Sequence, residues 1–389
     1  MGKREMMIHK AMKRRFLATA VMAVGVLSAL PAEAKRGSKE TKRAVDTMTA
    51  VEFGVPYEFC PPRYVCYRAP GEVTIDGRID STEWAGVPWT ADFVDIQGKN
   101  RPEVPRHRCR ARLMWDDRYL YIAAEMIEPH LWATLTERES VIFLDNDFEV
   151  FLDVTGTTHH YMEFEVNALG TEWDLMLTRP YRDGGMPLNA WNMNGMRSAV
   201  QLYGTLNDPS DVDERWTFEM AIPLSTLCEV RNRGAQVVDG EQWRLNFSRV
   251  QWLLDVVDGR YVKRPKMPED NWVWAPTGKI SIHEPEYWGF LQFSTVVAGE
   301  GTVPFAWDAN EGVKWALRQL YFRQREFRGA TGRWATMPEE LRAAEITVEG
   351  LQRFEPTVRA AGDGYRIVAA GADGTSWYID EQGYVGQGR

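Results

Sequence analysis

The chain has 389 residues, of which 44% are hydrophobic and 26% charged, as in ordinary globular proteins, and it is longer than one compact core usually requires. Its 16 Trp, 14 Tyr and 16 Phe exclude a disordered or low-complexity chain. The net charge is -9, and residues 1–34 hold six Lys/Arg against two Asp/Glu, so the remainder carries -9 - 4 = -13. Nucleic-acid binding needs a basic face, so this acidic body argues against a nucleic-acid partner.

The first 34 residues have the pattern of a secretory signal. Basic residues precede an apolar run from Phe16 to Leu30, and Ala32-Glu33-Ala34 supplies the small-x-small pattern of a cleavage site. The apolar run is shorter than the roughly 20 residues that a membrane-spanning helix needs. We therefore expect cleavage before Lys35, an exported protein in the periplasm or outside the cell, and no membrane span.

Export would place the four cysteines in an oxidising compartment, where three complete pairings are possible. Cys60 and Cys66 bracket two prolines and could close a small loop as a disulfide. Cys109 alternates with apolar residues and is equally consistent with a free, buried thiol. The cysteine spacing does not match a zinc site.

The middle of the chain predicts β-structure. Residues 35–66 are charged and then proline-rich, as in a linker. From residue 67 to about 298, short runs alternate between apolar and polar residues and end at turn residues, which is typical of antiparallel strands. The clearest runs are 148–152, 162–166, 216–222 and 243–247. The expected fold is mainly β: an antiparallel, jelly-roll-like β-sandwich with long loops.

The hydrophobic period changes near residue 300, which predicts a small α+β domain over residues 304–389. Asp308 can cap a helix that ends near Gly329. Its apolar face consists of Val313, Leu317, Leu320, Tyr321 and Phe327. A short helix is expected from Pro338, and strand-like runs at 365–368 and 376–379 predict a small antiparallel meander that packs on the long helix.

Two acidic strands are the most informative part of the sequence. If the loop at Gly156 closes a hairpin between runs 147–153 and 161–167, Glu149 faces Glu165 across the strand pair. Like charges in this position are destabilising, so they need a compensating arginine, a metal ion or a ligand that donates hydrogen bonds. A sugar has several hydroxyl donors and suits paired acceptors beside aromatic rings. Asn167 continues the same polar face, and solvated carboxylates without a ligand are the alternative.

Aromatic and polar residues near position 250 extend this candidate site. Trp272 and Trp274 lie two residues apart in an extended segment and could form a stacking platform for a sugar ring, with Trp252 nearby. Arg249 and Gln251 are polar residues on an otherwise apolar strand. We expect Arg249 to compensate the facing carboxylates, with a structural ion pair as the alternative.

Four short motifs, taken together and in order, resemble carbohydrate-binding module family 9 over residues 67–295. They are Ile75-Asp76-Gly77 with Glu83-Trp84, Trp115-Asp116-Asp117 with Tyr119-Leu120-Tyr121, Asp147 to Asp153, and Trp288-Gly289 with Leu291-Gln292-Phe293. The resemblance implies a sugar-binding β-sandwich with bound calcium and two tryptophans that clamp a terminal sugar. It implies that Glu149 contacts sugar hydroxyls and that Trp274 is one clamp residue, whereas the other clamp position is occupied by Phe143. The C-terminal unit resembles the head of a pilin-type protein.

Asp145 and Asp147 offer the oxygen ligands that Ca²⁺ prefers, although turn chemistry explains them equally well. No catalytic residue is assigned, because nucleophile motifs are absent from the sequence. The sequence therefore predicts a secreted, non-catalytic carbohydrate-binding protein with a role in carbohydrate catabolism. Two alternatives stay open. Glu149, Glu163 and Glu165 could serve a glycoside hydrolase, and a haem- or redox-binding sandwich would need an axial Met or His.

Overall fold

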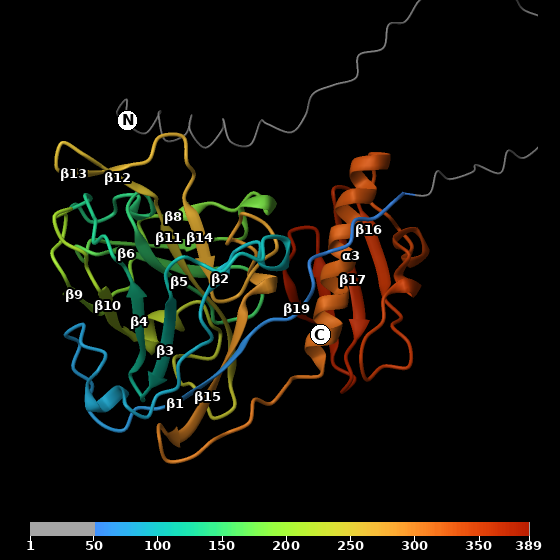
Figure 1. Cartoon of the computed structure of the whole chain (residues 1–389). Helices are drawn as coiled ribbons and strands as arrows, with labels where there is room; N and C mark the ends of the chain where they lie inside the picture. The colour runs from blue at the N-terminus through green and yellow to red at the C-terminus, as the bar shows by residue number, and fades with distance from the viewer. Residues whose placement is uncertain (1–50, 389) are drawn as a thin grey trace, which may run out of the picture. The chain divides into compact units, whose positions relative to one another are not determined.

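The computed structural model describes residues 51–388, which belong to one compact unit (Figure 1). The expected secretory signal lies outside the described residues. No helix within the described residues is long and apolar enough to cross a membrane.

Strands dominate the first 250 described residues, and one long helix marks the C-terminal part (Figure 1). The strands of the first part are β1 Arg63–Arg68, β2 Val94–Asp95, β3 Cys109–Trp115, β4 Tyr119–Ile127, β5 Asp147–Asp153, β6 Tyr161–Asn167, β7 Glu172–Leu177, β8 Pro187–Leu188, β9 Arg197–Tyr203, β10 Arg215–Pro223, β11 Gln242–Gln251, β12 Leu254–Val257, β13 Arg260–Lys263, β14 Asp270–Val273 and β15 Gly289–Val297. A four-residue helix, α2 Leu224–Leu227, follows β10. The C-terminal part contains α3 Asn310–Thr331, β16 Thr357–Ala361, β17 Gly364–Ala370, β18 Ser376–Asp380 and β19 Val385–Gln387.

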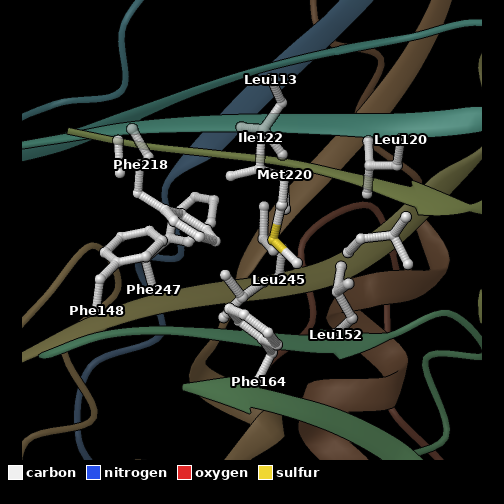
Figure 2. Close-up of a cluster of buried hydrophobic side chains, with 14 of the residues drawn as sticks. Leu113, Leu120, Ile122, Phe148, Leu152, Phe164, Phe218, Met220, Leu245 and Phe247 are labelled. Carbon is white, nitrogen blue, oxygen red and sulfur yellow. The ribbon is translucent and has the colours of Figure 1, made fainter. Parts of the chain in front are cut away.

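The predicted β-sandwich is present. Hydrogen bonds connect its strands in the order β8-β7-β6-β5-β11-β15-β1-β3-β4-β10-β9, with β14 beside β11. Apolar side chains of β5, β6 and β11 face those of β3, β4 and β10 across a buried core (Figure 2). One feature differs from the expected antiparallel pattern, because β1 pairs in parallel with both β15 and β3 and joins the two layers.

The alternating sequence runs explain how each strand divides its side chains. Phe148, Val150 and Leu152 point from β5 into the core, so the residues between them lie on the outer face of the sheet. The predicted hairpin register is confirmed: Glu149 pairs with Glu165 and Phe151 with Glu163.

The C-terminal part has its own apolar cluster, formed by one face of α3 and the meander β16–β19. The predicted helix face is buried as expected. Helix α3 ends at Thr331, two residues beyond the end expected near Gly329, and the next residue, Gly332, has a φ of 77°, the left-handed conformation that glycine adopts readily at a helix end. The short helix expected from Pro338 is instead two 3₁₀ turns, at Pro338–Leu341 and Ala343–Glu345.

The segment expected to be a linker contributes to the fold. Strand β1 begins at Arg63, and Val51 and Phe53 pack against the C-terminal cluster. The C-terminal part also bonds to the sandwich, since the Arg318 guanidinium donates to the Thr158 hydroxyl at 3.1 Å.

The expected Cys60–Cys66 disulfide is wrong for this structure, because all four cysteines are free. Cys60 is exposed, whereas Cys66 points from β1 into the core. From Arg63 onward the chain is an extended strand that rises about 3.3 Å per residue, so the distance between the two cysteines is too long for a disulfide.

Candidate carbohydrate-binding face

A row of four side chains crosses the outer face of the sheet from β11 to β7. Ser248 pairs with Glu149, Glu149 pairs with Glu165, and Glu165 pairs with Trp173. Directly paired residues share a face of the sheet, so the two carboxylates lie between a hydroxyl and an indole. Glu163 lies on the same face, one position along β6.

These carboxylates are buried without a cationic partner. Glu149 and Glu163 are each 5% exposed and Glu165 is 1% exposed, and no lysine or arginine forms an ion pair with them within residues 51–388. Burial raises the pKa of Glu149 to about 7, although a hydrogen bond with Ser248 opposes the shift. Burial, together with the Glu149 charge, raises the pKa of Glu163 to about 8 and raises that of Glu165 well above its usual value. The face therefore lacks the compensating cation that opposed charges require.

Asp147 adds a third carboxylate to the facing pair. One ligand oxygen from each of Asp147, Glu149 and Glu165 lies within 4.8 Å of the other two. Asp147 Oδ1 accepts the Val250 N–H at 2.8 Å, whereas its buried Oδ2 has no hydrogen-bond partner among the described residues. Burial and the charge of Glu149 raise the pKa of Asp147 well above its usual value. An oxygen cluster with an unsatisfied member can hold a proton, a cation or a hydroxyl donor.

Arg249 does not compensate the facing carboxylates, which corrects that expectation. Its guanidinium forms a 2.9 Å ion pair with Glu128, and both side chains are buried. Residue 249 continues the core-facing series of Trp243 and Phe247 on β11, so it points away from the outer face that carries Glu149. The structural ion pair, the alternative reading of Arg249, is therefore what the structure contains.

The other polar candidates near Arg249 are also occupied. Gln251 is 3% exposed and accepts a hydrogen bond from Arg249 Nε at 3.0 Å. Asn167 donates to the Leu135 carbonyl and to Asp145, and its own oxygen accepts the N–H groups of the turn after β6. Both side chains stabilise the fold around the acidic face and do not lie on it with a free donor or acceptor.

The expected indole platform is covered by protein. Trp272 is 3% exposed, with the guanidinium of Arg249 5.3 Å from its ring centroid. Trp274 is 4% exposed and lies against Gly289, where a Cβ would come within 2.3 Å of the indole. Trp252 is half-buried and donates from Nε1 to the Phe143 carbonyl at 3.0 Å. Stacking from Trp272 or Trp274 would therefore require these rings to leave the core.

Asp145 is not available as a metal ligand in this arrangement. Its carboxylate accepts the Thr134 and Leu135 N–H groups, the Thr134 hydroxyl and the Asn167 amide. Of the two aspartates expected to bind calcium, only Asp147 retains a free oxygen. Its neighbours in the cluster are Glu149 and Glu165, which the sequence pattern had assigned to sugar binding.

Sequence reasoning missed Trp173 and Ser248, and it treated Phe143 only as a departure from the family clamp. Trp173 and Phe143 are half-buried and flank Glu165, which accepts the Phe143 N–H at 3.0 Å. The sequence contained a signal for Trp173, namely the turn at Gly170. In a hairpin closed by that turn, paired residues have numbers that sum to 338, so Trp173 faces Glu165. Phe151 lies on the same face, since it pairs with Glu163, but its ring is fully buried.

A face of acidic acceptors between half-buried rings on a β-sandwich is typical of a carbohydrate-binding domain. Residues 75–239 match the family model described as "Carbohydrate family 9 binding domain-like". The match confirms, over residues 75–239, the resemblance to carbohydrate-binding module family 9 that the four sequence motifs indicate.

Solved structures with similarity to this chain were also found. One is a protein from Bacteroides uniformis that is provisionally described as a carbohydrate-binding protein. The two sequences are 16% identical, the match covers 60% of this chain and 100% of the other, and the TM-score is 0.45. A family 9 module from Caldicellulosiruptor kristjanssonii matches in its cellotriose complex, with 17% identity, 62% and 100% coverage and a TM-score of 0.39. Its glucose complex matches with 16% identity, the same coverage and a TM-score of 0.39. No curated protein matches.

Proposed function

We propose that the row Ser248–Glu149–Glu165–Trp173 is the site at which this protein binds carbohydrate, and that binding requires its buried carboxylates to become accessible to the sugar. The observation that carries the proposal is the pair of facing carboxylates without a cation, between a hydroxyl and an indole on one sheet face. The family match over residues 75–239 supports carbohydrate as the ligand, and the matched range includes Glu149, Glu165 and Trp173.

The chemistry of this row suits a sugar. Carboxylate oxygens accept hydrogen bonds from hydroxyl groups, and each charge-assisted bond contributes about 1.5–3 kcal/mol. Sugar hydroxyls would also satisfy the acceptors that repel one another in the free protein. Trp173 pairs with Glu165 and is half-buried, so its indole can contact the apolar C–H face of a pyranose ring. Glu149 then has the role that the family resemblance implies for it.

We further propose that the protein is exported and takes part in carbohydrate catabolism outside the cytoplasm. The signal-like pattern of residues 1–34 supports export. Binding without catalysis is consistent with a role in holding or delivering a saccharide to other proteins.

Calcium fits the cluster of Asp147, Glu149 and Glu165. Hard cations take carboxylate oxygens, and these three supply ligand atoms within 4.8 Å of one another, including the unsatisfied Asp147 Oδ2. The ion would neutralise the repulsion within the cluster and fix the orientation of Glu149. The residues of the chain would still make the sugar contacts, with Glu163, Ser248 and Trp173 next to the ion.

A glycan array followed by calorimetric titration with the best ligand tests the proposal. Glu149→Ala and Trp173→Ala should each weaken binding at least about tenfold, since about 1.4 kcal/mol corresponds to a factor of ten. Trp191→Ala is the matched control, because Trp191 is also half-buried but packs against the core cluster and donates from Nε1 to Glu229. Thermal melts accompany each variant. Unchanged affinity in both site variants would place the sugar elsewhere on the protein.

A further inference from the structure

A second cavity lies away from the acidic face, between the sandwich and the first turns of α3. Its volume is about 460 Å³, within the roughly 300–1,000 Å³ range of small-molecule sites. The sandwich contributes Arg244 of β11, and α3 contributes Lys314, Trp315 and Arg318. Trp307, in the connection between the two parts, completes the wall. None of the residues of the carboxylate row lines this cavity, so it is a separate site.

Two buried guanidinium groups line the cavity. Arg318 is 2% exposed, and its Nη2 donates to the Gly383 carbonyl at 2.8 Å and to Thr158. Its Nε and Nη1 have no hydrogen-bond partner within residues 51–388. Arg244 is 7% exposed, and its Nη2 donates to the Glu286 carbonyl at 2.6 Å. Buried donors without acceptors are costly, so this cavity favours an occupant that accepts hydrogen bonds.

The nearby carboxylates already have cationic partners. Glu286 is bound in a bidentate manner by Arg182, at 2.6 and 2.9 Å. Glu311 pairs with Lys314 and lies 3.9 Å from Arg244. Arg318 has no ion pair among the described residues, and it is the group whose charge and donors an anionic ligand would satisfy. Arginine suits a carboxylate because its fork of donors can bind both oxygens.

Aromatic rings form the more open side of the cavity. Trp307 is 38% exposed, so its indole is accessible to a ligand. Trp315 stacks on Phe59 with ring centroids 4.7 Å apart, which holds its indole in place. An accessible indole beside buried guanidinium groups matches a ligand that has both an oxyanion and a ring with apolar C–H groups.

We propose that this cavity binds an acidic saccharide. The carboxylate of a uronic acid would accept hydrogen bonds from Arg318 and Arg244, and its pyranose ring would lie against Trp307. The protein would then have two sugar sites of opposite charge preference. The acidic face favours neutral sugars that donate hydroxyl hydrogen bonds, whereas the cavity favours a sugar that carries a negative charge.

Calorimetric titration of the full-length protein tests the ligand class. The uronates of glucose, galactose and mannose are each compared with the parent hexose, and acetate serves as the carboxylate without a ring. At least one uronate should bind about tenfold or more tightly than both its parent hexose and acetate. Equal binding of every uronate and its hexose, or equal binding of acetate, would overturn the proposal, because the ring and the charge are both required.

Variants then locate the site. Trp307→Ala and Arg318→Gln should each weaken uronate binding about tenfold or more, whereas the matched control Trp191→Ala should leave it unchanged. If thermal melts show that Arg318→Gln is unfolded, Lys314→Gln takes its place. Glu149→Ala distinguishes the two sites, since it should weaken the neutral sugar and leave the uronate unaffected. Loss of uronate binding in Glu149→Ala, or full retention in Trp307→Ala, would place the uronate outside this cavity.

Discussion

The two polar clusters at the β5–β11 end of the sandwich are both buried but differ in how their charge is neutralised. On the core side, Arg249 pairs with Glu128 at 2.9 Å and donates to Gln251 and to a backbone carbonyl. On the outer face, Glu149 and Glu165 oppose each other without a cation. The first cluster is complete within the protein. The second has no compensating cation among the described residues, which is why we propose it, and not the first, as the binding site.

Disrupting the complete cluster should have the largest effect on stability. Arg249→Met leaves Glu128 buried without its partner, which costs about 3–5 kcal/mol of unfolding free energy. Chemical denaturation of the variant measures this loss. The double variant Arg249→Met/Glu128→Met removes both charges and should recover most of the stability. If Arg249→Met abolished sugar binding while keeping wild-type stability, Arg249 would belong to the binding site after all.

Much of the fold could be predicted from the sequence, because it depends on local periodicity. The alternation in β5 and β6 determined which residues face the core, and the turn between them set Glu149 opposite Glu165. The period of α3 was equally clear. The parallel pairing of β1 with β15 could not be inferred, since it joins segments more than 200 residues apart and leaves no local pattern.

The candidate site was only partly predictable for the same reason. Arg249 and Glu149 point to opposite faces of the sheet. Strand alternation shows this only once the pairing of β11 with β5 is known, because that pairing places Ser248, not Arg249, opposite Glu149. Trp274 is attractive as a stacking residue from composition alone, yet it fills the space that Gly289 leaves open. Trp173 was overlooked because its position on the outer face depends on a further strand pairing, that of β7 with β6.

Calcium offers a second way to test the difference between the two polar clusters. It should stabilise the outer cluster of Asp147, Glu149 and Glu165, which has no cation, and should not affect the Arg249–Glu128 pair. At a concentration one hundred times its dissociation constant, an ion that binds only the folded state adds about 2.7 kcal/mol. Thermal melts with Ca²⁺ and with EDTA measure the shift. Asp147→Asn should remove most of it, whereas Asp117→Asn, at a side chain that is 87% exposed, should retain it. An equal shift in Asp147→Asn would assign the ion to other residues.

The smallest expected effect is a pH dependence of stability to which the carboxylates of the outer face contribute. Burial raises the pKa of Glu163 from 4.5 to about 8 and that of Glu149 from 4.5 to about 7. A carboxyl whose pKa is raised by folding binds its proton more tightly in the folded state. Its contribution to stability is therefore fully present below about pH 4.5, declines as the pH rises, and is lost above the folded-state pKa.

In EDTA, the melting temperature should therefore fall by more than about 3 °C between about pH 5 and pH 9. Glu163→Gln keeps a neutral side chain at every pH and should flatten this decline. The control Glu214→Gln replaces a glutamate whose side chain is 64% exposed and should retain the wild-type slope. A decline of equal slope in Glu163→Gln would mean that the outer carboxylates are ionised in the folded protein and that their repulsion is relieved in another way.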